Sequence, residues 1–210
     1  LYNTISQDSG YIAAMVALSA ITATFTTLFM GTVSDRIGRR KPFMTWGYVI
    51  WALTVAAFAF VSPSSMKSVG VAATMVVVLD CVMTFFGSTA NDAVFNAYVT
   101  ESVENERRTK VESVIQIMPM AAMLIVFGVL DGFTQRGEWR TFFLITAFIM
   151  LIAGILSFFF IKEEKSEGKR DEKFLSNLIY GFLPSTVKEN KRLYISLLAF
   201  GINAIGMQVF

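Results

Sequence analysis

Long runs of apolar residues, each nearly free of charge, constrain this chain more than any other feature of its sequence. A helix that crosses a bilayer needs ~20 mainly apolar residues, whereas a run of ~10–14 is more typical of a buried core helix. Five runs reach or approach the spanning length and a sixth begins near the end of the chain: residues 11–30, 43–61, 69–91, 114–130, 141–161 and 193–210. A membrane barrel would instead alternate polar and apolar residues over ~10-residue segments. The sequence therefore predicts an all-α, polytopic membrane protein.

The composition agrees with a chain that is solvated by lipid. Of the 210 residues, 16% are charged and 54% are hydrophobic, against ~25% and ~45–50% in soluble domains. The chain has no His and one Cys, which excludes a disulfide framework, a Cys/His zinc site and a Ser-His-Asp triad within it. It also lacks the Gly-Lys-Ser loop that binds nucleotide phosphates. We therefore expect a protein that is not an enzyme or an ATP-driven pump, with no metal and no cofactor. A net charge of +2 gives no reason to expect nucleic acid as a partner.

The basic residues are distributed unequally among the segments that connect the apolar runs. Fifteen of the 18 Lys and Arg residues lie in alternate segments, which span residues 31–42, 101–110 and 162–192. The remaining three lie in the intervening segments: Lys67, Arg136 and Arg140. Because basic loops are retained on the cytoplasmic side, we expect the three basic segments to be cytoplasmic. The protein would be a multi-pass protein of the plasma or inner membrane.

The same pattern divides the chain into three parts. We expect an N-terminal helical bundle over residues 1–161, a central cytoplasmic loop over 162–192 and the start of a second bundle over 193–210. Within the loop, apolar residues recur at helical spacing over 174–183, which predicts a short amphipathic helix. It lies along the membrane surface or packs on the ends of the spanning helices. The chain starts without Met and stops within an apolar run, so we expect it to be part of a longer membrane protein.

The first basic segment carries residues at fixed offsets that a generic basic loop does not require. Residues Gly31–Pro42 read GTVSDRIGRRKP, a G-x-x-x-D-R-x-G-R-R-x-P pattern. Gly31 allows a close helix approach and Gly38 allows a tight turn. Asp35, at a helix boundary, can accept hydrogen bonds from backbone N–H groups or pair with Arg.

This segment resembles the signature between the second and third helices of the major facilitator superfamily. The resemblance extends over the chain, from helix two at residues 11–30 to the start of helix seven at 193–210. It implies a six-helix half of a twelve-helix carrier that binds its substrate between the halves, near mid-membrane. Helix one and most of the second half would be missing. It also implies a cytoplasmic gate latch that holds the halves together in the outward-open state, formed by Gly31, Asp35, Arg36, Gly38, Arg39 and Arg40.

A second resemblance lies in the fourth helix of that scheme. Residues 90–95 read ANDAVF and lead into an acidic and then Arg-containing loop. This stretch is similar to the glycoside–pentoside–hexuronide cation symporters, which are sugar carriers within the same superfamily. The resemblance implies that Asp92 contacts a sugar and that Thr89 lies near a coupling cation.

Polar side chains inside the apolar runs are the candidates for binding a solute or a cation. A charge at mid-membrane costs ~2.5–3.5 kcal/mol on insertion scales, so each one needs a reason. A spacing of ~100° per residue places three polar residues on the helical face of Asp92: Ser88, Thr89 and Asn96. We expect Asp92 to bind the substrate or a coupling proton, helped by Thr89, Asn91 and Asn96. The alternative is a structural hydrogen bond to a neighbouring helix.

Asp80 and Gln116 are two further candidates. Asp80 shares a second polar face with Thr84 and Asn91. Gln116 precedes Pro119, which kinks its helix by removing a backbone donor. Both side chains can face a wet cavity, and both can instead serve helix packing.

Together these features predict a secondary active transporter that moves a small polar solute by alternating access. Cation-coupled symport of a sugar-type solute is the leading form, because the fourth-helix Arg motif that efflux carriers tend to show is absent. Drug or metabolite efflux by an antiporter of the same superfamily stays open. So does a non-transporting membrane receptor or scaffold. The expected partners are the solute, a coupling proton or sodium ion, the lipid bilayer and the C-terminal half of the same polypeptide.

Overall fold

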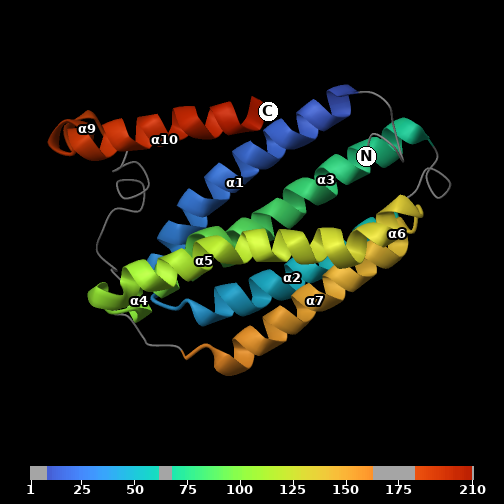
Figure 1. Cartoon of the computed structure of the whole chain (residues 1–210), viewed down its shortest axis with the longest axis horizontal. Helices are drawn as coiled ribbons and strands as arrows, with labels where there is room; N and C mark the ends of the chain where they lie inside the picture. The colour runs from blue at the N-terminus through green and yellow to red at the C-terminus, as the bar shows by residue number, and fades with distance from the viewer. Residues whose placement is uncertain (1–8, 62–67, 163–182, 210) are drawn as a thin grey trace. The chain divides into compact units, whose positions relative to one another are not determined.

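The computed structural model describes residues 9–61, 68–162 and 183–209, and these residues are almost entirely helical (Figure 1). No strand occurs in these three ranges. The chain divides into two units, Leu1–Gly168 and Lys169–Phe210.

Over residues 9–61 and 68–162 the first unit contains five continuous helical stretches, two of which combine several elements. In chain order its elements are α1 (Ser9–Ile37), α2 (Lys41–Phe58), α3 (Val69–Gly87), η1 (Ser88–Phe95), α4 (Asn96–Ser102), α5 (Asn105–Ile125), η2 (Val126–Leu130), α6 (Asp131–Gln135) and α7 (Trp139–Phe160). Elements α3, η1 and α4 form one helix, and α5, η2 and α6 form another. Four stretches are long and apolar enough to cross a membrane, with 29, 34, 31 and 22 residues. Helix α2, with 18 residues, packs among them. The prediction of an all-α membrane protein is confirmed.

Helix ends fall where the sequence supplies a stop or a start signal. Gly38 ends α1 with φ +66° and donates its backbone N–H to the carbonyl of Ser34 at 2.9 Å, a left-handed geometry that glycine adopts without a steric penalty. Pro42 lies in the first turn of α2, where its missing N–H costs nothing. Ser68 caps α3 by accepting from the backbone N–H of Val71 at 3.3 Å. The expected loop 31–42 is thus shorter than predicted, because the first half of the motif continues α1.

Small side chains allow the helices of the first unit to approach closely. Helix α2 packs on α7, α3 and η1, and α1 packs on α3 and η1. A Cβ placed on Gly47 of α2 would lie 2.8 Å from the Cβ of Ala90 in η1. A Cβ on Gly154 of α7 would lie 3.2 Å from the side chains of Tyr48 and Val49. Close packing through small residues is the usual way in which helices associate in lipid, where no hydrophobic effect drives them together.

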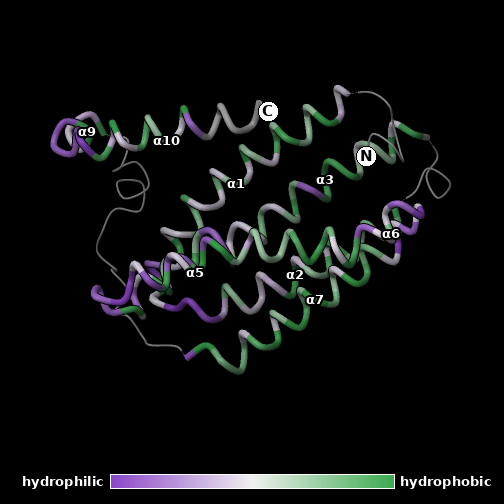
Figure 2. The backbone as a smooth tube through the Cα atoms, in the orientation of Figure 1, coloured by the Kyte–Doolittle hydropathy of each residue, from purple (hydrophilic) through white to green (hydrophobic). Residues whose placement is uncertain are grey.

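Many large apolar side chains lie on the surface of the unit. Leu124 is 74% exposed and Phe160 is 78% exposed, whereas much of the core consists of alanine and valine. Figure 2 shows hydrophilic residues gathered at the ends of the helices, with mostly apolar stretches between them. A surface of this kind requires lipid as its solvent.

The second unit contains α9 (Pro184–Glu189) and α10 (Lys191–Val209). Proline at the first position of α9 is favourable because its fixed φ suits a helix start. The end of the predicted 162–192 loop is therefore helical, and α10 begins two residues before the predicted run. The amphipathic segment predicted over residues 174–183 lies outside the described residues except for Leu183, which precedes α9.

Candidate functional site

Three of the six candidate residues, Thr89, Asn91 and Asp92, lie in a π-helical segment. In η1 (Ser88–Phe95) the backbone hydrogen bonds run from residue i to i+5, inside an otherwise α-helical span. Two side chains bond to carbonyls along this segment. Thr89 Oγ1 donates to the carbonyl of Phe85 at 2.7 Å, and Asn96 Nδ2 donates to the carbonyl of Asp92 at 3.1 Å. Short π segments within α-helices frequently occur at functional sites.

The π segment separates the candidate residues into a buried group and an exposed group. Ser88 and Thr89 are 5% and 3% exposed, on a segment that packs on α1 and α2. Asn91, Asp92 and Asn96 are exposed. A spacing of ~100° per residue predicts that Ser88 and Thr89 share the face of Asp92; in the structure Ser88 and Thr89 are buried, whereas Asp92 is exposed.

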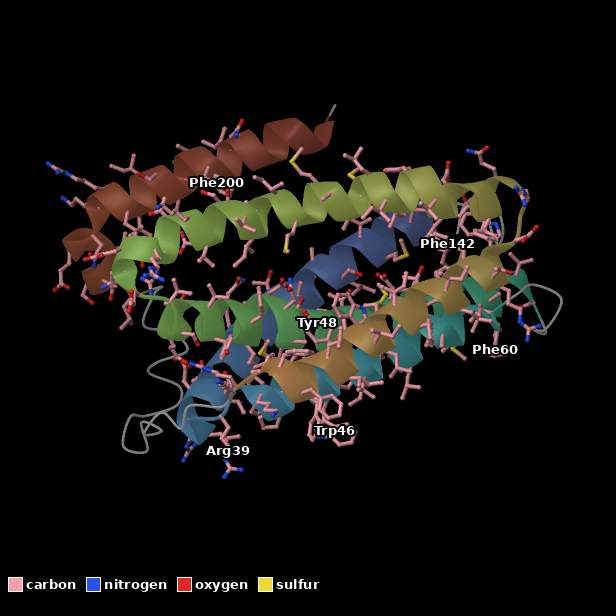
Figure 3. All side chains as sticks on the ribbon, turned by 60° about the horizontal axis from the view of Figure 1, so that its bottom comes forward. Arg39, Trp46, Tyr48, Phe60, Phe142 and Phe200 are labelled. Carbon is pink, nitrogen blue, oxygen red and sulfur yellow. The ribbon has the colours of Figure 1, made fainter. Side chains whose placement is uncertain are left out.

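Asp92 presents its carboxylate on the exposed side of the membrane-length helix. Asn91 Nδ2 donates to Asp92 Oδ1 at 3.1 Å. The Tyr48 hydroxyl of α2, labelled in Figure 3, lies within electrostatic range of this carboxylate. Tyr48 is not among the residues that the sequence predicts for the site. The sequence shows a tyrosine within an apolar run, but it does not show which neighbouring helix the Tyr48 side chain faces.

Tyr48 belongs to an aromatic pair that packs on the end of α3, directly before the π segment. Its ring stacks on that of Trp51, with centroids 5.9 Å apart and an interplanar angle of 19°. The Trp51 indole lies 3.1 Å from where a Cβ on Gly87 would be. Buried Trp51 Nε1 has no hydrogen-bond partner among the described residues. A polar atom left without a protein partner in an apolar interior can bind water or a solute.

Asp80 and Gln116 lie in different surroundings from Asp92. Ser19 Oγ of α1 donates to Asp80 Oδ2, which joins α1 to α3 across the bundle. This bond agrees with the packing alternative for Asp80. Gln116 is exposed on α5, a helix that contributes no buried residue to the unit.

Arg40 of the signature forms an ion-pair cluster with Asp35 near the end of α1 and Glu101 near the end of α4. Arg40 Nη2 lies 2.5 Å from Asp35 Oδ1 and donates to Glu101 Oε1 at 2.6 Å, and Arg40 Nε donates to Glu101 Oε2 at 3.1 Å. Arg40 Nη1 donates to Ser34 Oγ, and Ser34 Oγ donates to the carbonyl of Gly31 at 3.0 Å. The Arg40 side chain is 11% exposed, against 58% for Asp35 and 47% for Glu101.

The charge of Arg40 is secured by its partners. Burial lowers the pKa of Arg40, but hydrogen bonds to Glu101 and Asp35 and the negative charges of both carboxylates raise it by more. The pKa of Arg40 therefore lies above its ordinary value. Because a cation with a raised pKa loses its charge only when the pH rises through that value, Arg40 stays charged throughout the physiological range.

The remaining signature residues divide by position. Gly38 makes the turn that carries the chain from α1 to Arg40. Arg36 and Arg39 are exposed, and Figure 3 labels Arg39 at this end of the helices. The expected close helix approach at Gly31 is not found in the described part of the chain, since a Cβ there would meet no atom within 4 Å. Glu101 was overlooked, because it lies 61 residues from Arg40 and the sequence alone does not pair them.

Membrane-length helices, a polar π segment within one of them and an ion-pair cluster at one end define a polytopic helical membrane protein. The family profile of the Major Facilitator Superfamily matches residues 1–210. The chain therefore belongs to the major facilitator superfamily, and its helices correspond to half of such a bundle, as predicted. It is an integral membrane protein of a family of secondary transporters, which carry small-molecule solutes rather than catalyse reactions. No curated protein and no solved structure matches the chain.

Proposed function

We propose that this chain is one half of a carrier that accumulates a small polar solute, with a sugar-type solute and a coupling proton or sodium ion as the leading combination. The exposed Asp92 carboxylate on a π-helical segment carries this proposal. A charge within a membrane-spanning helix is expensive unless it faces water or a partner. In carriers, interrupted helices hold the solute and ion sites near the middle of the membrane.

The residues around Asp92 suit a ligand that is rich in hydroxyl groups. An ionised carboxylate accepts short, strong hydrogen bonds from such groups. Asn91 offers an amide beside it, and the Tyr48 hydroxyl adds a donor from α2. We assign Thr89 to supporting the π segment rather than to touching the solute, because its hydroxyl already donates to Phe85. Asp80, bonded to Ser19, joins two helices in this scheme.

The test is solute accumulation by the complete carrier in sealed vesicles under an imposed proton or sodium gradient. We expect a sugar or polyol to accumulate above its external concentration, and to be released when an ionophore collapses the gradient. Outward transport of an amphiphilic compound in exchange for protons would favour the efflux alternative. Failure of every solute class under every gradient would favour a receptor or scaffold.

We further propose that the Arg40 end is cytoplasmic and that its cluster acts as a latch during cycling. The hydrogen bonds of Arg40 go to residues of this half of the carrier, Ser34 in α1 and Glu101 in α4. The exposed Arg36 and Arg39 remain available to groups on the second half. In this arrangement Arg40 holds the α1–α2 turn in place, and Arg36 and Arg39 form contacts with the second half that are made and broken during cycling.

Removal of the Glu101 charge should slow cycling without weakening solute binding. Hydrogen bonds to charged groups contribute ~1.5–3 kcal/mol, but Glu101 is 47% exposed, so solvent screening reduces this to ~1 kcal/mol. We expect Glu101→Gln to lower the maximal uptake rate about fivefold and to change the half-saturating solute concentration by less than about twofold. Initial uptake rates across solute concentrations measure both quantities.

Glu104→Gln is the matched control for this experiment. Glu104 is 78% exposed and pairs only loosely with Arg107, at 3.7 Å. Its uptake rate should equal that of the unsubstituted carrier. A large rise in the half-saturating concentration with Glu101→Gln would argue against a latch and place Glu101 in the solute pathway.

A further inference from the structure

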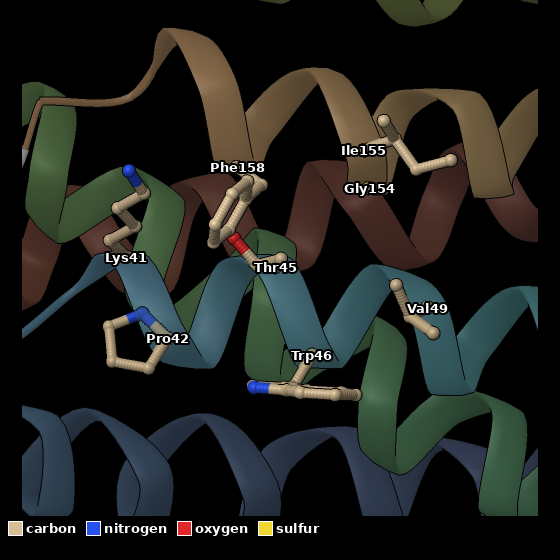
Figure 4. Close-up of a pocket in the computed structure, with 8 residues that line it drawn as sticks. All are labelled: Lys41, Pro42, Thr45, Trp46, Val49, Gly154, Ile155 and Phe158. Carbon is tan, nitrogen blue, oxygen red and sulfur yellow. The ribbon is translucent and has the colours of Figure 1, made fainter.

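A groove runs between α2 and α7 at the end of the unit where Lys41 begins α2 (Figure 4). Its volume is ≈ 510 Å³. Both helices contribute to its lining: Lys41, Pro42, Thr45, Trp46, Val49, Gly154, Ile155 and Phe158. Most of these side chains are apolar, so the groove suits a hydrocarbon chain.

The packing of the two helices explains the position of the groove. At Gly154 the helices approach so closely that a Cβ would lie 3.2 Å from Tyr48 and Val49. Beyond this contact, Phe158 of α7 and Trp46 of α2 are 54% and 64% exposed. Neither ring is enclosed by the described part of the unit. The groove is therefore open on the apolar surface that faces lipid.

One charged residue lies at the end of this apolar groove. Lys41 is the only charged residue among the eight that line it, and its Nζ lies 4.9 Å from the centroid of the Phe158 ring. The carboxylates of Asp35 and Glu101 are bonded to Arg40. In the described ranges, Lys41 forms no ion pair. A cation over an aromatic ring keeps donors for a further anion.

We propose that this groove binds an anionic phospholipid, with its phosphate at Lys41 and an acyl chain along Trp46 and Ile155. An apolar channel with one cation that forms no ion pair within residues 9–61, 68–162 and 183–209 is complementary to an anionic amphiphile. Basic pockets between spanning helices bind anionic head groups in this way, and one basic residue near the membrane surface contributes roughly 1 kcal/mol. Trp46 lies near the end of its helix, the level at which indole rings favour the membrane interface.

Other occupants fit the groove less well. An inorganic phosphate would use Lys41 but leave the apolar lining empty. A zwitterionic lipid would use the apolar lining, but its own positive group would compete with Lys41 for the phosphate. A second copy of the chain would shield Trp46 from all lipids alike.

Quenching of Trp46 fluorescence by brominated lipids tests the proposal. The protein, with Trp51 and Trp139 replaced by Phe, is reconstituted in phosphatidylcholine vesicles that contain increasing fractions of brominated phosphatidylglycerol or brominated phosphatidylcholine. We expect phosphatidylglycerol to bind beside Trp46 about fivefold more strongly than phosphatidylcholine. Trp51 packs on Gly87, so its replacement can disturb the structure. The titration is therefore repeated on the protein with all three Trp residues, and the fluorescence of the Trp46→Phe variant is subtracted to isolate the signal of Trp46.

Two charge removals complete the experiment. Lys41→Gln should lower the preference for phosphatidylglycerol to about equal binding. Lys110→Gln removes the same charge from an exposed position on α5 and should leave the preference unchanged. The proposal is overturned if the unsubstituted protein shows no preference, if both substitutions reduce the preference equally, or if neither lipid quenches Trp46.

Discussion

Asp92→Asn should abolish uphill accumulation of the solute by the complete carrier while the protein still inserts into the membrane. Asn keeps the size of the side chain and one acceptor but removes the charge. Loss of charge-assisted hydrogen bonds costs ~1.5–3 kcal/mol, which corresponds to a roughly 10- to 100-fold loss in solute affinity. If Asp92 also carries the coupling proton, the vesicles should only equilibrate the solute. Accumulation ratios in vesicles under a fixed gradient, together with the amount of inserted protein, give the result.

Asp131→Asn is the matched control. Asp131 begins α6, where its carboxylate accepts from Thr134 Oγ1 at 2.6 Å and from Gln135 Nε2 at 2.7 Å. This role is local to one helix end, so we expect accumulation close to that of the unsubstituted carrier. Unchanged accumulation in Asp92→Asn would show that the solute site lies elsewhere. Solute exchange that survives while accumulation is lost would assign Asp92 to coupling rather than to solute binding.

Gly47→Leu should have the largest effect on stability. A Cβ at this position would already lie 2.8 Å from the Cβ of Ala90, which is fully buried in η1. A larger side chain must push η1 away from α2, and overpacking of this kind costs ~3 kcal/mol. We expect a lower thermal unfolding midpoint in detergent and a much smaller yield of folded protein. Because Tyr48 is the next residue, displacement of η1 should also disturb the surroundings of Asp92.

Gly128→Leu is the comparison for this substitution. A Cβ at Gly128 of η2 would meet no atom within 4 Å among the described residues, so the same side chain should be tolerated there. Gly47→Ala should lower the stability, because its Cβ meets that of Ala90. Adding Ala90→Gly removes the opposing Cβ, so the double variant should be more stable than Gly47→Ala alone. Equal stability of Gly47→Leu and Gly128→Leu would contradict the close packing of α2 on η1.

The membrane-spanning helices could be predicted because a bilayer imposes a length on apolar runs. Each predicted run over residues 11–161 lies within a helical stretch or overlaps one closely. Helix ends were less predictable, because a basic segment reads as a loop whether or not its first residues continue a helix. The motif at residues 31–37 belongs to α1 for this reason. The chain reverses only at Gly38, where φ is positive.

The contacts of the candidate site were less accessible to sequence reasoning. Arg40 and Glu101 are 61 residues apart, as are Ser19 and Asp80, and a single sequence does not show which distant residues meet. Burial around Asp92 was a further limit. Ser88 and Thr89 are buried, whereas Asn91 and Asp92 are exposed, and helical spacing predicts a shared face but not the burial of each residue on it.

The π segment also has a mechanical consequence. An i→i+5 turn contains one residue more than an i→i+4 turn, so the helix holds a surplus residue over Ser88–Phe95. If that surplus were expelled, the part of the helix beyond it would rotate by about 100° and shift by about 1.5 Å. A rotation of this size would turn Asn96 and Glu101 of α4 to a different side of the helix, while α3 stayed in place. Loss of the surplus residue from the π segment would therefore change the orientation of α4 about the helix axis relative to α3.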